Sequence, residues 1–158
     1  MGSKELKTRD QIDKKYKWNI EAMISDESTI EKDLSDLKQK ALEYNEKYAG
    51  HLADSADTLL NAFIEKDELS RKLEKIYVYV RMRRDENNAD SKYQAMTDMT
   101  MAVIAAVSAS LSFFTPELLA SDEAVIRGYM DECKGLDTYR FVIDDAFREK
   151  EHILSEKE

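Results

Sequence analysis

The chain has 158 residues, of which 42% are hydrophobic and 36% are charged, and its formal net charge is -9. This size fits one domain with a core of its own, and an acidic surface disfavours binding to nucleic acid and to anionic membranes. Four glycines and one proline supply few tight turns, which favours an all-α fold, and the single cysteine, Cys133, excludes an internal disulfide and fits a reducing, cytoplasmic location.

Residues 1–27 form a polar, irregular N-terminal arm that we expect to pack on the domain. The arm has no apolar segment of the kind that a signal peptide requires. Its large apolar residues would face water if the arm were a free tail, so packing is favoured. These residues are Ile12, Tyr16, Trp18, Ile20, Met23 and Ile24.

Three amphipathic helices are predicted before a polar turn at residues 85–90. The first ends at Gly50, which suits a left-handed residue after a helix. Ser55 opens a second, short helix, and a third follows from about Asp67. The first helix has one apolar stripe, with residues at intervals of three and four. The stripe consists of Ile30, Leu34, Leu37, Ala41, Tyr44 and Tyr48.

The next helix differs from the others because no residue from Met99 to Pro116 is charged. A helix that is apolar nearly all round is usually buried on most sides, so we expect it to lie in the centre of the core. At about 18 residues the run is also long enough to be considered as a membrane span. Several Ser and Thr residues dilute the run and its neighbours have soluble patterns, so the core interpretation is favoured.

Shorter helices are predicted in the C-terminal third. The Thr-Pro-Glu sequence at 115–117 is a helix start, Ser121 starts another helix that Gly135 closes, and the last runs from about Asp137. Short connections favour an antiparallel helical bundle of about five to six helices over residues 28–154. The apolar side of the last helix is predicted to be Tyr139, Val142, Ile143, Ala146 and Phe147.

Residues 155–158 read S-x-x-E, which is the capping box that starts a helix. A natural C-terminus rarely carries a helix start without a helix. We therefore expect these residues to be the start of a truncated next helix, with a longer protein beyond them.

The sequence lacks the motif that catalysis by a zinc peptidase would need. A zinc peptidase needs H-E-x-x-H, in which two histidines one turn apart bind the metal and the glutamate activates water. The two histidines, His51 and His152, are far apart and neither begins that motif. Cys133 lies near a predicted helix C-terminus, where the helix dipole disfavours a reactive thiolate. The sequence therefore predicts no catalytic residue and no metal ligand within the chain.

Aromatic and cationic residues gather at two places, and such clusters are typical of interfaces and peptide-binding walls. The alternative is that the tyrosines pack with their hydroxyls at the surface and the arginines pair with nearby acids. The channel or interface candidates are Tyr77, Tyr79, Arg81 and Arg84, with Arg83 between them, and later Tyr139 and Arg140.

Several segments, taken in order along nearly the whole chain, resemble the N-terminal region of oligoendopeptidase F-type proteins. None is diagnostic singly, but the collinear set is specific. Asp13 stands where the family commonly has proline, and Glu151 stands where proline is common before the histidine. The segments are RDQI at 9–12, YKWNIE at 16–21, LADS at 52–55 leading to Leu59 and Leu60, DELS at 67–70 through YVY at 77–79, LSFFTPELL at 111–119, and YRF at 139–141 through REKEHILS at 148–155.

The resemblance implies a thimet oligopeptidase-like zinc metalloendopeptidase that hydrolyses short peptides in a channel between helical lobes. Such an enzyme carries zinc on H-E-x-x-H plus a downstream glutamate in a catalytic domain, and none of those ligands maps onto this chain. What carries over is a non-catalytic lobe that shapes the channel and docks on the catalytic domain. Arg148, His152 and Leu154 lie where the chain would enter that domain, so they are candidate boundary contacts.

A severed lobe predicts an exposed apolar patch where the catalytic domain should sit, and a homodimer through that patch is a further possibility. A competing hypothesis is a stand-alone helical module that binds a partner helix or peptide in a groove. A third is a membrane-associated helical protein built on residues 99–116.

Overall fold

The computed structural model describes residue 7 and residues 9–150, and these contain six α-helices, five short 3-10 helices and no strand. The predicted all-α bundle is therefore confirmed. The predicted helix start at 155–158 and two boundary candidates, His152 and Leu154, lie outside the described residues. The α-helices are α1 (Ile30–Tyr48), α2 (Ala56–Glu86), α3 (Ser91–Leu111), α4 (Phe114–Ala120), α5 (Glu123–Glu132) and α6 (Arg140–Glu149); the 3-10 helices are η1 (Arg9–Gln11), η2 (Lys14–Tyr16), η3 (Ile20–Ala22), η4 (Glu27–Thr29) and η5 (Lys134–Tyr139).

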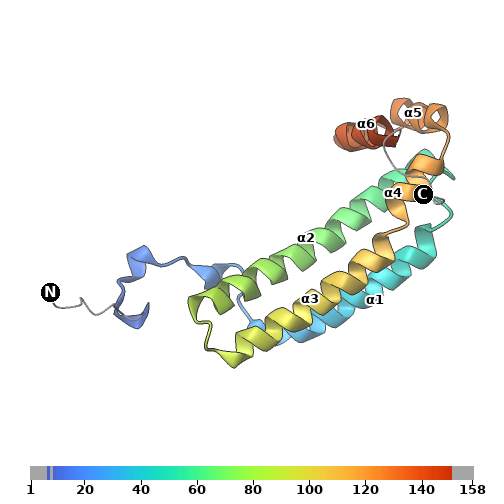
Figure 1. The fold of residues 1–158 in the computed structure, drawn as a ribbon. Coiled ribbons are helices and arrows are strands. Elements are labelled where there is room, and N and C mark those ends of the chain that lie inside the picture. The colour runs from blue at the N-terminus through green and yellow to red at the C-terminus, as the bar shows by residue number, and fades with distance from the viewer. Residues whose placement is uncertain (1–6, 8, 151–158) are drawn as a thin grey trace.

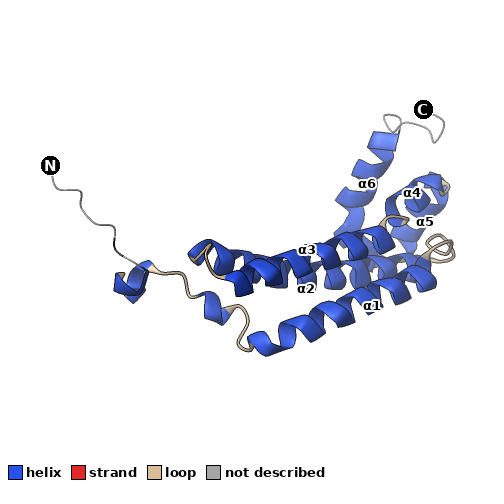
Figure 2. Cartoon of the chain, turned by 60° about the horizontal axis from the view of Figure 1, so that its bottom comes forward, coloured by secondary structure: helices blue, strands red, loops and turns tan. Residues whose placement is uncertain are grey.

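The three long helices α1, α2 and α3 lie side by side and make an elongated bundle (Figure 1). Each runs antiparallel to the next in sequence, so α1 and α3 run in the same direction. The short helices α4, α5 and α6 gather at the end of the bundle where α1 ends and α2 begins, and the N-terminal arm extends from the opposite end (Figure 2).

Helix α1 follows its sequence pattern closely. All six residues of the predicted stripe are buried, from Ile30 to Tyr48. Gly50 has φ +83°, which is the left-handed conformation predicted for it, and a residue with a Cβ would be strained there.

The two helices predicted around Ser55 and Asp67 are one helix of 31 residues, so that division was wrong. Ser55 does cap it, because its hydroxyl accepts the backbone N–H of Thr58 at 3.0 Å. No glycine or proline occurs between Ala56 and Glu86. Without such a residue, the backbone hydrogen bonds of the helix continue without interruption. The polar sequence Glu65–Lys66–Asp67 adds charge to the helix but does not end it.

The aromatic centre of the fold joins α2 to the short helices. The ring of Phe63 stacks on Tyr139 with centroids 4.4 Å apart and meets Phe114 edge-on at 4.8 Å. Gly135 allows η5 to approach α2 closely, since a Cβ at that position would lie 2.6 Å from a methyl group of Leu60. Gly135 thus sits inside the α5–α6 connection as a close-approach residue.

The start of α4 differs from the prediction. The helix begins at Phe114, one residue before Thr115, and no side chain caps it. Glu117 instead reaches across to the α1–α2 connection, where its carboxylate accepts the backbone N–H groups of Gly50 at 2.7 Å and Leu52 at 2.9 Å. A charged acceptor on these two donors fixes α4 against the end of α1.

The arm packs only in part, which corrects the expectation that its apolar residues all lie on the core. Ile20 is buried, and Met23 and Ile24 pack against the core. Tyr16 and Trp18 are exposed, the indole by 80%. The apolar contacts of the arm with the core therefore begin at Ile20, and before it Arg9 pairs with Glu86 of α2.

Candidate interaction surface

The strongest electrostatic cluster lies where the arm meets the far end of α2 and the start of α3. The carboxylate of Glu27 accepts hydrogen bonds from the hydroxyl of Tyr79, from the hydroxyl of Tyr93 at 2.7 Å and from the ammonium of Lys92 at 2.5 Å. Burial opposes ionisation of Glu27, but these bonds outweigh it and lower the pKa to about 2. The guanidinium of Arg83 lies 5.7 Å from the Tyr79 ring and 5.6 Å from the Tyr93 ring. This cluster ties η4, α2 and α3 together.

Of the candidate residues on α2, Tyr79 belongs to this cluster, whereas Arg81 and Arg84 reach the solvent. Tyr79 is 99% buried and its hydroxyl donates to Glu27, whereas Tyr77 is half-buried. Arg81 and Arg84 lie beside Asp85, at 3.4 Å and 3.8 Å. The two arginines therefore pair with a nearby acid and remain accessible to a ligand or partner.

The second group of candidates lies elsewhere. Tyr139 stacks on Phe63, which precedes Tyr79 by 16 residues on α2, so about 24 Å of helix separates the two tyrosines. Arg140 is exposed and pairs with Asp137 at 2.7 Å. The structure does not bring the two groups of candidates into one site.

Helix α6 exposes apolar side chains next to the boundary candidate Arg148, whose guanidinium pairs with Asp145. Phe141 is 74% exposed and Val142 is 51% exposed. The prediction that Val142 faces inward was therefore wrong. Ile143 and Phe147 occupy the buried side instead, and the exposure of Phe141 was not predicted.

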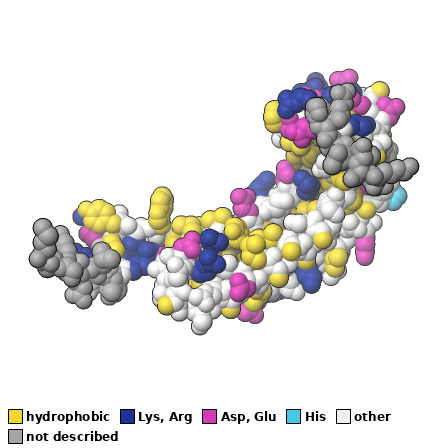
Figure 3. Space-filling view, in the orientation of Figure 1, with side chains coloured by type: hydrophobic (Ala, Val, Ile, Leu, Met, Phe, Trp, Pro, Cys, Tyr) yellow, Lys and Arg dark blue, Asp and Glu magenta, His cyan; other side chains and the backbone are white. Residues whose placement is uncertain are grey.

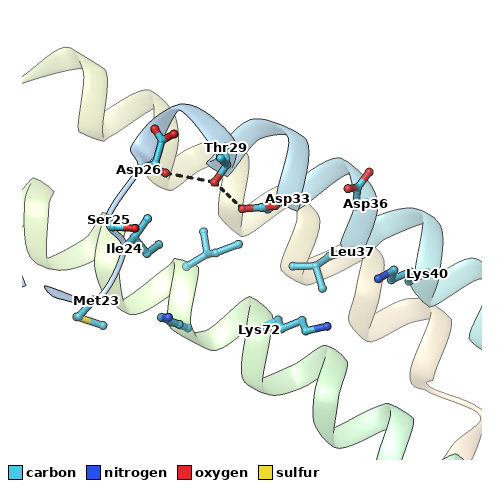
Figure 4. Close-up of a pocket in the computed structure, with 12 residues that line it drawn as sticks. Met23, Ile24, Ser25, Asp26, Thr29, Asp33, Asp36, Leu37, Lys40 and Lys72 are labelled. Atoms are coloured by element: carbon cyan, nitrogen blue, oxygen red, sulfur yellow. Dashed lines mark hydrogen bonds between the residues drawn. The ribbon is translucent and has the colours of Figure 1, made fainter. Parts of the chain in front are cut away.

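A groove of about 470 Å³ lies between the arm, α1 and α2 (Figure 4). Its floor includes Leu37 and Ile76, and the hydroxyl of Thr29 on its rim donates to Asp33 at 2.8 Å. Acidic and basic side chains share the rim, so the groove does not select one sign of charge. Its lining residues are Met23, Ile24, Ser25, Asp26, Thr29, Asp33, Asp36, Leu37, Lys40, Lys72, Lys75 and Ile76.

Within residue 7 and residues 9–150, no group of three or more His, Cys, Asp or Glu side chains is arranged to hold a metal ion. His51 is exposed and its Nδ1 lies 2.8 Å from a carboxylate oxygen of Asp54. Cys133 is half-buried. The described residues therefore do not fit a zinc site.

Helix α3 was predicted to lie in the centre of the core, but it lies at the surface of the bundle. Only Met96, Thr97, Thr100 and Val107 are buried on it. The segment Ser91–Ala120 is apolar and long enough to cross a membrane, yet only 22% of its most apolar window is buried. Figure 3 shows hydrophobic atoms scattered along the outer side of the bundle. The exposed side of α3 between Met99 and Ser112 is thus an uncharged surface, and it fits the predicted apolar patch.

Comparison with known proteins finds relatives among oligopeptidases. A family model described as Peptidase_M3_N, Oligopeptidase F, matches residues 117–158. Group B oligopeptidase PepB of Streptococcus agalactiae is 33% identical over 150 residues, which is 95% of this chain and 25% of that protein. Oligopeptidase PepF of Bacillus subtilis is 28% identical over 154 residues, which is 98% of this chain and 23% of that protein.

Solved structures agree with the sequence matches. Oligoendopeptidase-F from Enterococcus faecium superimposes with a TM-score of 0.71 at 28% identity, over 82% of this chain and 26% of that one. A structure from Chlamydophila abortus gives a TM-score of 0.80 over 97% of this chain and 26% of that one, and at 20% identity it supports the fold alone. The resemblance predicted from the sequence is confirmed, and the chain spans about a quarter of the length of these relatives.

Proposed function

We propose that this chain is the non-catalytic N-terminal lobe of an oligoendopeptidase F-type zinc metalloendopeptidase. Nearly its whole length is similar to a stretch that makes up about a quarter of the length of such a protein, as expected for a single domain of it. The lobe shapes the channel that admits short oligopeptides and docks on a catalytic domain. The collinear match of 150 residues to PepB at a quarter of its length is the observation that supports this function most strongly.

Zinc enters this proposal only through the longer protein. The described residues lack a fitting ligand set, so the metal and the water that it activates belong to the catalytic domain. The contribution of this chain is then steric and electrostatic: a rigid helical wall limits which peptides reach the metal. A cytoplasmic location accords with the single cysteine.

Two sets of residues are proposed for this role. The accessible cations Arg81, Arg84 and Arg140, with the half-buried Tyr77, are candidates for the channel or its rim. The exposed side of α6, with Phe141, Val142 and Arg148, is a candidate contact with the catalytic domain, because two adjacent large apolar residues, Phe141 and Val142, are both exposed there and contiguous apolar surface is typical of an interaction site.

A comparison of two proteins tests the function. One is the 158-residue chain, and the other is the product of the whole reading frame in which it lies. Hydrolysis of a fluorogenic oligopeptide and zinc content are measured for both, with a chelator added as a control. We expect chelator-sensitive cleavage and one zinc from the longer protein, and neither from the 158-residue chain. Stoichiometric zinc and cleavage by the short chain, with contaminating proteases excluded, would contradict the proposal.

A second candidate function is a stand-alone helical module that binds a peptide or a partner helix. The groove between the arm, α1 and α2 favours it, because apolar floor and polar rim are combined there. A stop codon directly after Glu158 would support this function and exclude the first.

A further inference from the structure

Helix α3 carries an exposed surface that the boundary residues on α6 do not explain. We define its uncharged face as Met101, Ala102, Ala105, Ser108, Ala109 and Ser112, all of which are exposed. We propose that this face is a second docking surface, covered by an apolar helix from the part of the longer protein that this chain lacks. The inference rests on the proposed function and adds to it where, and by what kind of element, the lobe is held.

The spacing of these residues places them along one side of α3. Positions 101, 105, 108 and 112 recur at intervals of four, three and four, which is the repeat of one helical face. Most of the side chains are small, so a second helix can approach to about 8 Å between the axes. Met101, which is 47% exposed, supplies a flexible apolar contact at one end of the face.

Two hydroxyl groups on or beside this face are bonded within α3 or at its end. Ser112 Oγ donates to the carbonyl of Ala109 at 2.8 Å, and Ser110 Oγ donates to the carbonyl of Ala106 at 3.2 Å. Covering such groups with an apolar surface removes little hydrogen bonding to water. These two serines are therefore compatible with a dry interface.

The side of α3 that meets α1 lies elsewhere on the helix. Asn45 on α1 donates to the carbonyl of Ser110 at 2.8 Å, and Ser110 is about 140° round α3 from the middle of the uncharged face. The contact with α1 therefore leaves the uncharged face uncovered.

Three kinds of partner could cover such a face: a lipid bilayer, a second copy of the chain, or another part of the same protein. A bilayer would have to accommodate α1 and α2 as well, and their exposed sides are densely charged. The relatives favour the third partner, because each contains about three times as much additional chain as the part that matches. In such a protein, chain that can cover α3 is always present at high local concentration.

Cysteine labelling tests this assignment. Cys133→Ser provides the background, and Ala105→Cys places a thiol in the middle of the uncharged face. Gln39→Cys is the matched control, since Gln39 is exposed on α1 and bonds only Glu43 among the contacts described for its side chain. Each variant is made in the 158-residue chain and in the product of the whole reading frame, and its rate of reaction with a maleimide is measured under native conditions, with circular dichroism to verify folding.

We expect Ala105→Cys to react at least tenfold more slowly in the longer protein than in the short chain, and Gln39→Cys to change by less than twofold. Equal reaction of Ala105→Cys in both proteins would overturn the inference. Chelator-sensitive peptidase activity of the longer protein, measured on the same samples, shows separately whether the proposed function holds. Slower labelling of the short chain at higher concentration, with a dimer in sedimentation, would assign the face to a second copy and also overturn it. Flotation of the short chain with phosphatidylcholine vesicles would overturn it in favour of lipid.

Discussion

Helices α1 and α3 are neighbours of similar length, 19 and 21 residues, but the side chains that they expose to solvent differ in charge. Helix α1 buries six residues in one stripe and presents charged side chains to solvent. Helix α3 buries four residues, and from Met99 onward its exposed side chains are uncharged, chiefly Ala, Ser and Met. Charge on the exposed side of α1 is typical of a surface in contact with solvent, whereas the lack of charge on α3 beyond Asp98 is typical of a surface that a partner covers.

The same substitution on the two helices should give opposite results. Ala41 on α1 is 0% exposed, and Ala105 on α3 is exposed. Ala41→Glu puts an unpaired carboxylate into the core and is expected to lower the free energy of unfolding by about 3–5 kcal/mol, whereas Ala105→Glu should change it by less than about 0.5 kcal/mol in the 158-residue chain. Urea denaturation followed by circular dichroism measures both. A loss above 2 kcal/mol for Ala105→Glu would mean that α3 is buried after all.

A loss of 3–5 kcal/mol can leave a small domain unfolded. Ala41→Leu therefore accompanies Ala41→Glu, because overpacking a core position costs about 1–3 kcal/mol and leaves the protein measurable. Ala105→Leu on the exposed helix should again stay within about 0.5 kcal/mol.

The start of α3 is held by charge, in contrast to its middle. Glu27→Gln removes the acceptor charge for Lys92, Tyr79 and Tyr93 and is expected to lower the free energy of unfolding by about 1–3 kcal/mol at pH 7. The pKa of Glu27 is lowered from 4.5 to about 2 on folding, so its contribution is complete above pH 4.5 and is lost as the pH falls toward 2. The difference in the free energy of unfolding between the unsubstituted chain and Glu27→Gln should therefore shrink as the pH falls from 4.5 toward 2.

Denaturation in urea at a series of pH values from 7 to 2.5 measures this dependence. Asp36→Asn serves as a control for the loss of one exposed carboxylate on the groove. A difference for Glu27→Gln that does not vary with pH would show that ionisation of Glu27 contributes nothing to folding.

A polar contact between α1 and α3 has an intermediate expected effect. Asn45→Ala removes the donor to the carbonyl of Ser110 and should lower the free energy of unfolding by about 0.5–1.5 kcal/mol. Thermal unfolding and amide hydrogen exchange at the end of α3 are the measurements. Unchanged exchange near Ser110 would indicate that the two helices are held by apolar contacts alone.

The smallest effect on folding is expected at the accessible cations. Arg140→Ala removes an exposed ion pair with Asp137 and should leave the free energy of unfolding nearly unchanged. If Arg140 belongs to the channel of the longer protein, the same substitution should change KM for oligopeptides there. An effect on stability as large as that of Glu27→Gln would instead give Arg140 a structural role.

The sequence predicted well those elements whose exposed side is polar. The stripe from Ile30 to Tyr48, the cap at Ser55 and the left-handed Gly50 were confirmed because each depends on neighbours within one or two turns. The same logic failed for the uncharged run that begins at Met99. Its residues carry no record of which side meets another helix, because every side of the run is apolar enough to be buried.

The candidate site shows the same division. Composition identified clusters of tyrosine and arginine, but it could not show that Tyr79 is spent on Glu27 or that Tyr139 lies about 24 Å of helix away from it. The exposed Phe141 was missed, since on periodicity alone an apolar residue beside Val142 and Ile143 has several equivalent orientations. Glu27 could not be distinguished from the other acids of residues 1–27, because its partners lie on α2 and α3, far away in the sequence.

By itself, the sequence determined that this protein is all-α, that α1 is amphipathic, and that its relatives are oligoendopeptidase F-type proteins, because helix propensity, periodicity and collinear similarity are properties of the chain as written. Only the tertiary structure decided that residues 56–86 are one helix, that Glu27 joins the arm to two helices, and that α3 lies at the surface. Burial depends on which other segments occupy the space around a helix, and that is settled by the packing of the whole chain.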